Sequence, residues 1–119
     1  MNESQPVFMQ IMERIESDII TGAYETGDLI ISTTQISKVY SVNPATAVKA
    51  VGKLTDAGIL YKDRGIGMRV AEGAKEKITE RRRAVFLNQT VDALLGEAET
   101  LSISVEEMVS IIRERGKFR

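Results

Sequence analysis

Hydroxyl and ammonium groups recur along one stretch of the chain, and they are the side chains best suited to chemistry. Residues 44–57 carry Thr46, Lys49 and Lys53 at spacings that suit a helix. At about 100° per residue, Lys49 points away from the apolar stripe of this helix, and Thr46 and Lys53 lie on one flank. Such donors bind phosphate oxygens and the acceptor atoms of bases. The pattern predicts a nucleic-acid contact or, as a plainer alternative, a solvated helix face with two ordinary lysines.

The chain lacks the residue types that most catalytic and metal sites need. Its 119 residues include no Cys and no His, so neither a thiolate nor an imidazole is present to act as base, nucleophile or ligand. The apolar-periodic residues 6–21 form a predicted core helix whose other face carries Glu13, Glu16 and Asp18. No nucleophile accompanies these carboxylates, so we expect a solvated surface. We therefore expect no enzyme, no cofactor and no metal.

Two short helices joined by a tight turn must position the hydroxyls and cations. Ser32 and Gln35 have the spacing of a capping box, which opens the first helix. Asn43 caps the second helix, Pro44 takes its first position, and Gly58 ends it. The apolar stripe that must face a core consists of Ala47, Ala50, Val51 and Leu54.

A β-hairpin is expected directly after the second helix. Residues 59–63 and 68–71 are strand-like, and the turn between them contains Gly65 and Gly67, which permit positive φ. The basic residues of this hairpin are Lys62, Arg64 and Arg69. A glycine tip with an arginine suits a narrow minor groove or its phosphates. Two helices, a tight turn and a hairpin in this order predict a winged helix-turn-helix.

Charge is unevenly distributed along the chain. Residues 38–69 carry six Lys or Arg against two Asp, about +4, whereas residues 1–37 carry one Arg against six acids, about −5. The formal net charge of the whole chain is only −1. Any DNA binding should therefore depend on the local basic patch and on the geometry of a dimer.

Residues 6–71 resemble the N-terminal domain of GntR-family transcription regulators. The landmarks, in order, are Pro6-Val7, Thr21-Gly22-Ala23-Tyr24, Gly27-Asp28, residues 42–50, Leu54, residues 58–61 and residues 64–68. The start of the second helix, the hairpin tip and the short tail resemble the YtrA-like branch in particular. Many relatives carry arginine at the positions of Thr34 and Val48 and an aromatic residue at that of Arg69, so this chain departs from the pattern there.

The resemblance implies a homodimeric regulator, a repressor of transporter operons, that binds a palindromic DNA operator. The expected DNA-binding residues are Ser32, Thr33, Thr34, Asn43, Ala45, Thr46, Lys49, Lys53, Lys62, Arg64, Gly65 and Gly67. The alternative is a winged-helix protein-interaction module without DNA binding. Its mark would be an apolar recognition face, of which Val48 is the only hint.

Residues 74–119 form a second part, predicted as helices over residues 74–100 and 104–116. Ser104 and Glu107 have capping-box spacing at the start of the shorter helix. Two helices cannot bury a core of their own, so their apolar faces must meet the winged domain, residues 1–73, or another subunit. Dimerisation is favoured because a two-fold DNA reader needs two half-sites. The expected interface residues are Phe86, Val91, Leu94, Leu95, Met108 and Ile112.

The fold class is thus mainly α with a small β-hairpin: a winged helix-turn-helix domain followed by a short two-helix dimerisation tail. We expect the tail to be too small to enclose a ligand pocket of about 300 Å³. An effector, if one exists, would then sit at the dimer interface or between the domains.

The chain carries none of the usual marks of secretion or of a membrane protein. Residues 2–5 are polar and unlike a signal peptide, and no apolar run approaches the roughly 18–20 residues of a membrane span. We expect a cytoplasmic protein with no membrane contact.

Overall fold

The computed structural model describes residues 5–119. Residues 2–4, part of the polar segment used above to predict the absence of a signal peptide, lie outside the described residues. The chain forms two compact units, Met1–Glu80 and Arg81–Arg119. The predicted boundary at residue 74 is the first residue of a helix, and the units divide later because Ala74 and Ile78 are buried in the core of the first unit.

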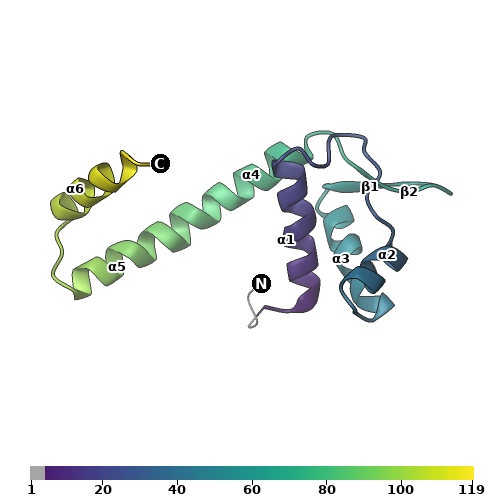
Figure 1. Cartoon of the computed structure of the whole chain (residues 1–119), viewed down its shortest axis with the longest axis horizontal. Coiled ribbons are helices and arrows are strands. Elements are labelled where there is room, and N and C mark those ends of the chain that lie inside the picture. The colour runs from purple at the N-terminus through teal and green to yellow at the C-terminus, as the bar shows by residue number, and fades with distance from the viewer. Residues whose placement is uncertain (1–4) are drawn as a thin grey trace. The chain divides into compact units, whose positions relative to one another are not determined.

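Three helices build most of the first unit: α1 (Val7–Ile20), α2 (Thr33–Val39) and α3 (Pro44–Asp56). Helix α3 packs against both α1 and α2, as Figure 1 shows. The predicted caps are confirmed. Ser32 Oγ accepts from the Gln35 amide at 3.1 Å, and Gln35 Oε1 accepts from the Ser32 amide at 2.9 Å. Asn43 Oδ1 accepts from the Ala45 amide at 2.9 Å.

The core lies where these helices meet. The whole predicted stripe of α3 is buried, together with Ile36 of α2. From α1 it receives Ile11, Ile15 and Ile19, and Phe8 and Met12 pack at its edge.

Glu16 contradicts the expectation of a solvated acidic surface on α1. Only 2% of the residue is exposed. It lies four residues from both Met12 and Ile20, so it shares the row of α1 that packs against the core. Glu13, in contrast, is exposed, and its Oε1 accepts from Gln5 Nε2 at 2.8 Å.

The hairpin consists of β1 (Leu60–Asp63) and β2 (Gly67–Val70), paired antiparallel with Leu60 opposite Val70. Residues 27–30 line the other edge of β2. The Gly27 amide donates to Val70 O at 2.9 Å, and the Ile30 amide donates to Met68 O at 2.9 Å. The hairpin therefore has one covered edge, a feature that the strand pattern of the sequence does not predict.

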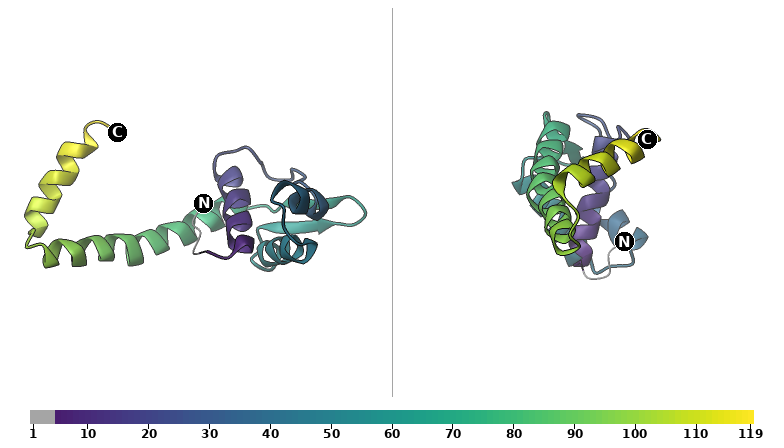
Figure 2. Two further views of the ribbon diagram at one scale, coloured as in Figure 1. Left: turned by 60° about the horizontal axis from the view of Figure 1, so that its bottom comes forward. Right: turned by 90° about the vertical axis from the view of Figure 1, so that its left-hand side faces the viewer.

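The second unit is entirely helical. Helix α4 (Ala74–Val85) runs from the first unit into it, and a π-helical stretch, η1 (Phe86–Val91), and α5 (Asp92–Thr100) follow without interruption. The chain then turns and forms α6 (Val105–Gly116), whose start is capped by Ser104 Oγ accepting from the Glu107 amide at 3.1 Å (Figure 2). The two predicted helices of the tail are thus confirmed, the longer one with a π-helical stretch in its middle. Within residues 5–119, no helix combines the length and apolar character needed to cross a membrane.

Candidate nucleic-acid interface

The start of α3 presents a small and mostly uncharged surface to solvent. Ala45, Val48 and Lys49 are exposed, whereas Thr46 is half-buried. Asn43 is exposed too, but its side-chain oxygen is already used to cap the helix. The backbone of α3 can therefore approach a partner closely along this surface.

Lys49 and Lys53 are brought together by an aromatic ring on another helix. Their ammonium nitrogens lie 4.2 and 5.7 Å from the centre of the Phe8 ring of α1. The negative face of the ring attracts both cations. The two lysines therefore place positive charge on the flank of α3 that faces α1. Sequence reasoning missed this role of Phe8 because its spacing predicts only a core residue.

The predicted residues at the start of α2 lie at the surface. Ser32 and Thr34 are exposed, and Thr33 is half-buried. The Ser32 hydroxyl caps the helix, which leaves Thr34 as the side chain here with the greatest freedom to contact a partner.

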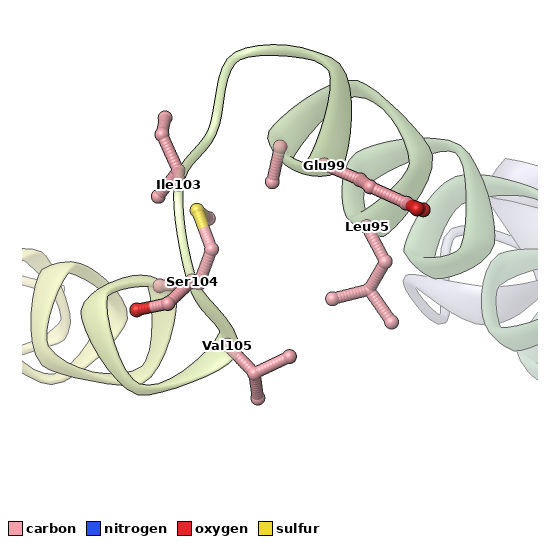
Figure 3. Close-up of a pocket in the computed structure, with 7 residues that line it drawn as sticks. Leu95, Glu99, Ile103, Ser104 and Val105 are labelled. Atoms are coloured by element: carbon pink, nitrogen blue, oxygen red, sulfur yellow. The ribbon is translucent and has the colours of Figure 1, made fainter.

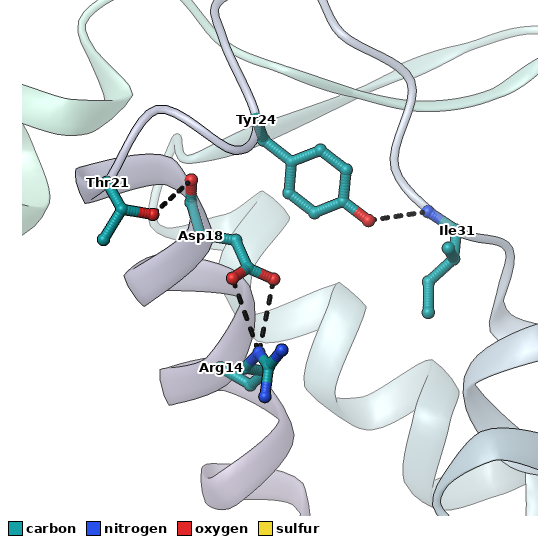
Figure 4. Close-up of polar contacts among 5 residues, drawn as sticks. All are labelled: Arg14, Asp18, Thr21, Tyr24 and Ile31. Carbon is teal, nitrogen blue, oxygen red and sulfur yellow. Dashed lines mark hydrogen bonds and ion pairs between the residues drawn. The ribbon is translucent and has the colours of Figure 1, made fainter.

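Polar contacts lie within the loop that leads into α2 and along the end of α1, as Figure 4 shows. Tyr24 Oη accepts from the Ile31 amide at 3.4 Å, just before the Ser32 cap. On α1, Arg14 Nε donates to Asp18 Oδ2 at 3.4 Å. Burial raises the pKa of the hydroxyl of Tyr40, at the end of α2. The positive charge of Arg14 opposes that shift.

The tip of the hairpin is built for an exposed, glycine-bearing turn. The Ile66 amide donates to Asp63 O at 3.0 Å, and Gly65 adopts φ +76°. Arg64, Gly65 and Ile66 are exposed at the tip, which projects beyond α2 and α3 in Figures 1 and 2. Lys62 is exposed on β1, just before the turn. This geometry resembles a wing with two cations near its tip.

Arg69 does not add free charge to the wing, although the sequence places it among the basic residues of the hairpin. Its Nε donates to Asp63 Oδ2 at 2.7 Å, and its Nη1 donates to Gly27 O at 2.8 Å. The hydrogen bond with Asp63 raises the pKa of Arg69 above its ordinary value. The guanidinium therefore joins both hairpin strands to residues 27–30, and its charge is offset by a carboxylate within the fold.

The second unit exposes a large apolar surface. Of the predicted interface residues, Phe86 and Ile112 are more than half exposed, Leu94 and Leu95 are exposed to a lesser extent, and Val91 and Met108 are half-buried. Other exposed apolar side chains of this unit are Val85, Leu87, Leu101, Val105, Val109 and Phe118. Ala98 is its only buried hydrophobic residue among those that the structure describes.

A hollow of about 320 Å³ lies between α5 and α6. Leu95 and Val105 face it from the two helices in Figure 3, and Ile103 and Met108 complete its apolar lining. This hollow is open to solvent and does not enclose a ligand, so the expectation that the tail is too small to enclose a pocket of about 300 Å³ stays a prediction.

Comparisons with known proteins agree with this architecture. No protein-family model matches the chain. The transcriptional repressor YtrA of Bacillus subtilis is 26% identical over 111 residues, which cover 93% of this chain and 85% of YtrA. The DNA-binding domain of AraR, solved in complex with operator ORE1, is 31% identical, with a TM-score of 0.54 over 56% of this chain and 82% of that domain.

A crystal structure from Bacteroides thetaiotaomicron is described as that of a putative transcriptional regulator of the GntR family. It is 33% identical, with a TM-score of 0.78, over 94% of this chain and 97% of that one. These relatives are transcriptional regulators and not enzymes, which confirms the prediction that this chain is not an enzyme. With its winged helix-turn-helix and its match to that structure over almost the full length of both chains, the protein belongs to the GntR family of transcriptional regulators and is similar to YtrA.

Proposed function

We propose that this protein is a sequence-specific DNA-binding repressor that acts as a homodimer on a palindromic operator. The observation that carries the proposal is the surface formed by α3 and the hairpin, where Lys49, Lys53, Lys62 and Arg64 are all exposed. Helix α3 would lie in the major groove, and the hairpin tip would contact the neighbouring minor groove or its phosphates. The likeness to the AraR domain, which was crystallised with operator DNA, supports this use of the surface.

Homodimerisation is supported by the exposed apolar side chains of η1, α5 and α6. Phe86 is 54% exposed and Ile112 is 55% exposed, although both are large and apolar. Burying such side chains contributes about 1.5–3 kcal/mol each. A second copy of the chain would supply the same apolar surface, and the resulting two-fold symmetry requires two symmetric half-sites on DNA.

The repressor role rests on similarity to YtrA, which is described as a repressor. The resemblance of this chain to the YtrA-like branch also suggests that the operator belongs to a transporter operon. A protein that binds chromosomal operators acts where that DNA is, so we place it in the cytoplasm. If the protein has a small-molecule effector, the hollow between α5 and α6 is a candidate binding site for it.

Selection of bound sequences from random DNA duplexes with the full-length protein tests the proposal. Binding to the selected duplex is then followed by fluorescence anisotropy across a salt series. Lys49→Ala, Lys53→Ala and Arg64→Ala should each flatten the dependence of log K on log salt by roughly 1 for each phosphate that the variant no longer neutralises. Lys75→Ala, on the exposed start of α4, is the matched control and should leave the slope unchanged.

The alternative is a winged-helix module that binds a protein through the same surface. Val48 favours it, because this apolar side chain is exposed on α3. In that case no duplex would be enriched, and affinity for DNA would not depend on salt. Equal slopes for the native protein and the three interface variants would likewise remove the start of α3 and the wing from the contact.

A further inference from the structure

Val48 is the side chain on the exposed start of α3 that the cationic interface leaves unexplained. It is 57% exposed, one turn before Gly52 and next along the helix surface to Ala45. Together these residues present methyl groups and bare backbone. Single exposed apolar residues are common on protein surfaces, so exposure alone indicates nothing. The position of Val48 on α3, together with the contacts and burial of the polar residues near it, indicates a role.

The polar groups around Val48 are used in a cap, directed to one flank of α3 or half-buried. Asn43 uses Oδ1 to cap α3 at 2.9 Å from the Ala45 amide, whereas a bidentate contact with adenine needs both that oxygen and the side-chain nitrogen. Lys49 holds its ammonium nitrogen 4.2 Å from the centre of the Phe8 ring, on the flank that faces α1. Thr46 is half-buried. The group that this part of α3 offers most freely is therefore the apolar side chain of Val48.

The major groove contains one apolar feature that distinguishes bases, the C5-methyl group of thymine. We propose that Val48, with Ala45 beside it, is a specificity-determining residue that recognises a thymine methyl group in the operator. This inference rests on the proposed function, because it assumes that α3 enters the major groove. Beyond that function, it identifies thymine as the base that Val48 recognises.

The test uses the full-length protein and the duplex obtained by selection. Each thymine in that duplex is replaced in turn by deoxyuridine, which keeps every hydrogen-bonding group and removes only the methyl group. Binding of the native protein, of Val48→Ala and of Val39→Ala is measured by anisotropy at one salt concentration. Val39 is the matched control, since it is a valine that is 71% exposed at the end of α2.

We expect at least one thymine whose replacement weakens binding of the native protein by about fourfold, the effect of removing one buried methyl group. The same replacement should have little effect on Val48→Ala and the full effect on Val39→Ala. Circular dichroism melts of the three proteins confirm that they are equally folded under the conditions of the binding assay.

Three outcomes would overturn the inference, and they are distinguishable from one another. If no duplex is selected, the proposed function fails and the inference fails with it. If a duplex is bound but every thymine replacement affects the native protein and Val48→Ala equally, the inference alone is wrong. A selected operator without thymine at any position sensitive to Val48→Ala would also reject it.

Discussion

At the residue scale, several side chains in the candidate interface serve to position others. The Phe8 ring on α1 gathers Lys49 and Lys53, at 4.2 and 5.7 Å from its centre, and so joins the first helix to the charge of the third. Arg69 joins the hairpin to residues 27–30 through Asp63 and the Gly27 carbonyl. The exposed cations of the wing thus depend on an ion pair that itself need not contact DNA.

Arg69→Lys tests this positioning role. A lysine keeps the positive charge, but its single ammonium group lacks the planar fork that reaches both Asp63 and Gly27 O. We expect a melting temperature lower by a few degrees and weaker operator binding, with an unchanged salt slope. Arg113→Lys, on the exposed surface of α6, is the matched control. If Arg69 contacts phosphate directly, Arg69→Ala will instead lower the slope by roughly 1.

Local and distant residue contacts differ in how far the sequence predicts them. The Ser32–Gln35 capping box and the Asn43 cap are fully predictable, because both partners lie within three residues. The contacts of Arg69 with Gly27 and of Lys49 with Phe8 join residues about 40 positions apart. No periodicity marks such pairs. The sequence does not predict the burial of Glu16 either, because that burial depends on which row of α1 packs against the core.

At the element scale, the wing keeps its shape through backbone geometry as much as through side chains. Gly67 opens β2 with φ +145°, a conformation that L side chains rarely adopt. A Cβ at this position would lie 3.2 Å from Leu29 Cδ1. Glycine at this position therefore lets β2 lie close to residues 27–30. Gly52 differs, because it lies inside α3 and an added Cβ would meet nothing within 4 Å.

These two glycines should respond to alanine in opposite directions. Gly67→Ala should lower the free energy of unfolding by about 1–3 kcal/mol, because of the unfavourable backbone conformation and the contact with Leu29. Gly52→Ala should raise it by about 0.5–1 kcal/mol, since alanine is the better helix former. Urea denaturation of both variants measures the difference. Equal stability of Gly67→Ala and the native protein would show that the hairpin tolerates another geometry at this position.

At the scale of the whole molecule, the two units differ in how many of their apolar side chains are buried. The first unit buries a contiguous core drawn from α1, α2, α3, the hairpin and the start of α4. In the second unit, Ala98 is buried, but Phe86 of η1, Leu94 and Leu95 of α5 and Ile112 of α6 are exposed. Helix positions in the tail follow from the sequence, since caps and periodicity are local. What covers its apolar side chains depends on a partner, which the periodicity of a single chain does not identify.

Replacing Leu94 and Met108 together with glutamate should convert the proposed dimer into monomers. Each substitution places a charge where an apolar side chain would be buried between subunits, and charge burial without a partner is unfavourable. Because α5 and α6 do not contribute to the core of the first unit, the winged domain should stay folded. A monomer engages one half-site at a time and should lose most of its operator affinity.

Size exclusion with light scattering measures the mass, and anisotropy measures operator binding. The matched control is Thr100→Glu with Ser110→Glu, which adds the same charge to exposed polar positions of α5 and α6 and should leave a dimer. Native protein that is monomeric at micromolar concentration would contradict the proposal. So would a Leu94→Glu, Met108→Glu variant that remains dimeric, because dimerisation would then use a surface other than the exposed apolar side chains of η1, α5 and α6.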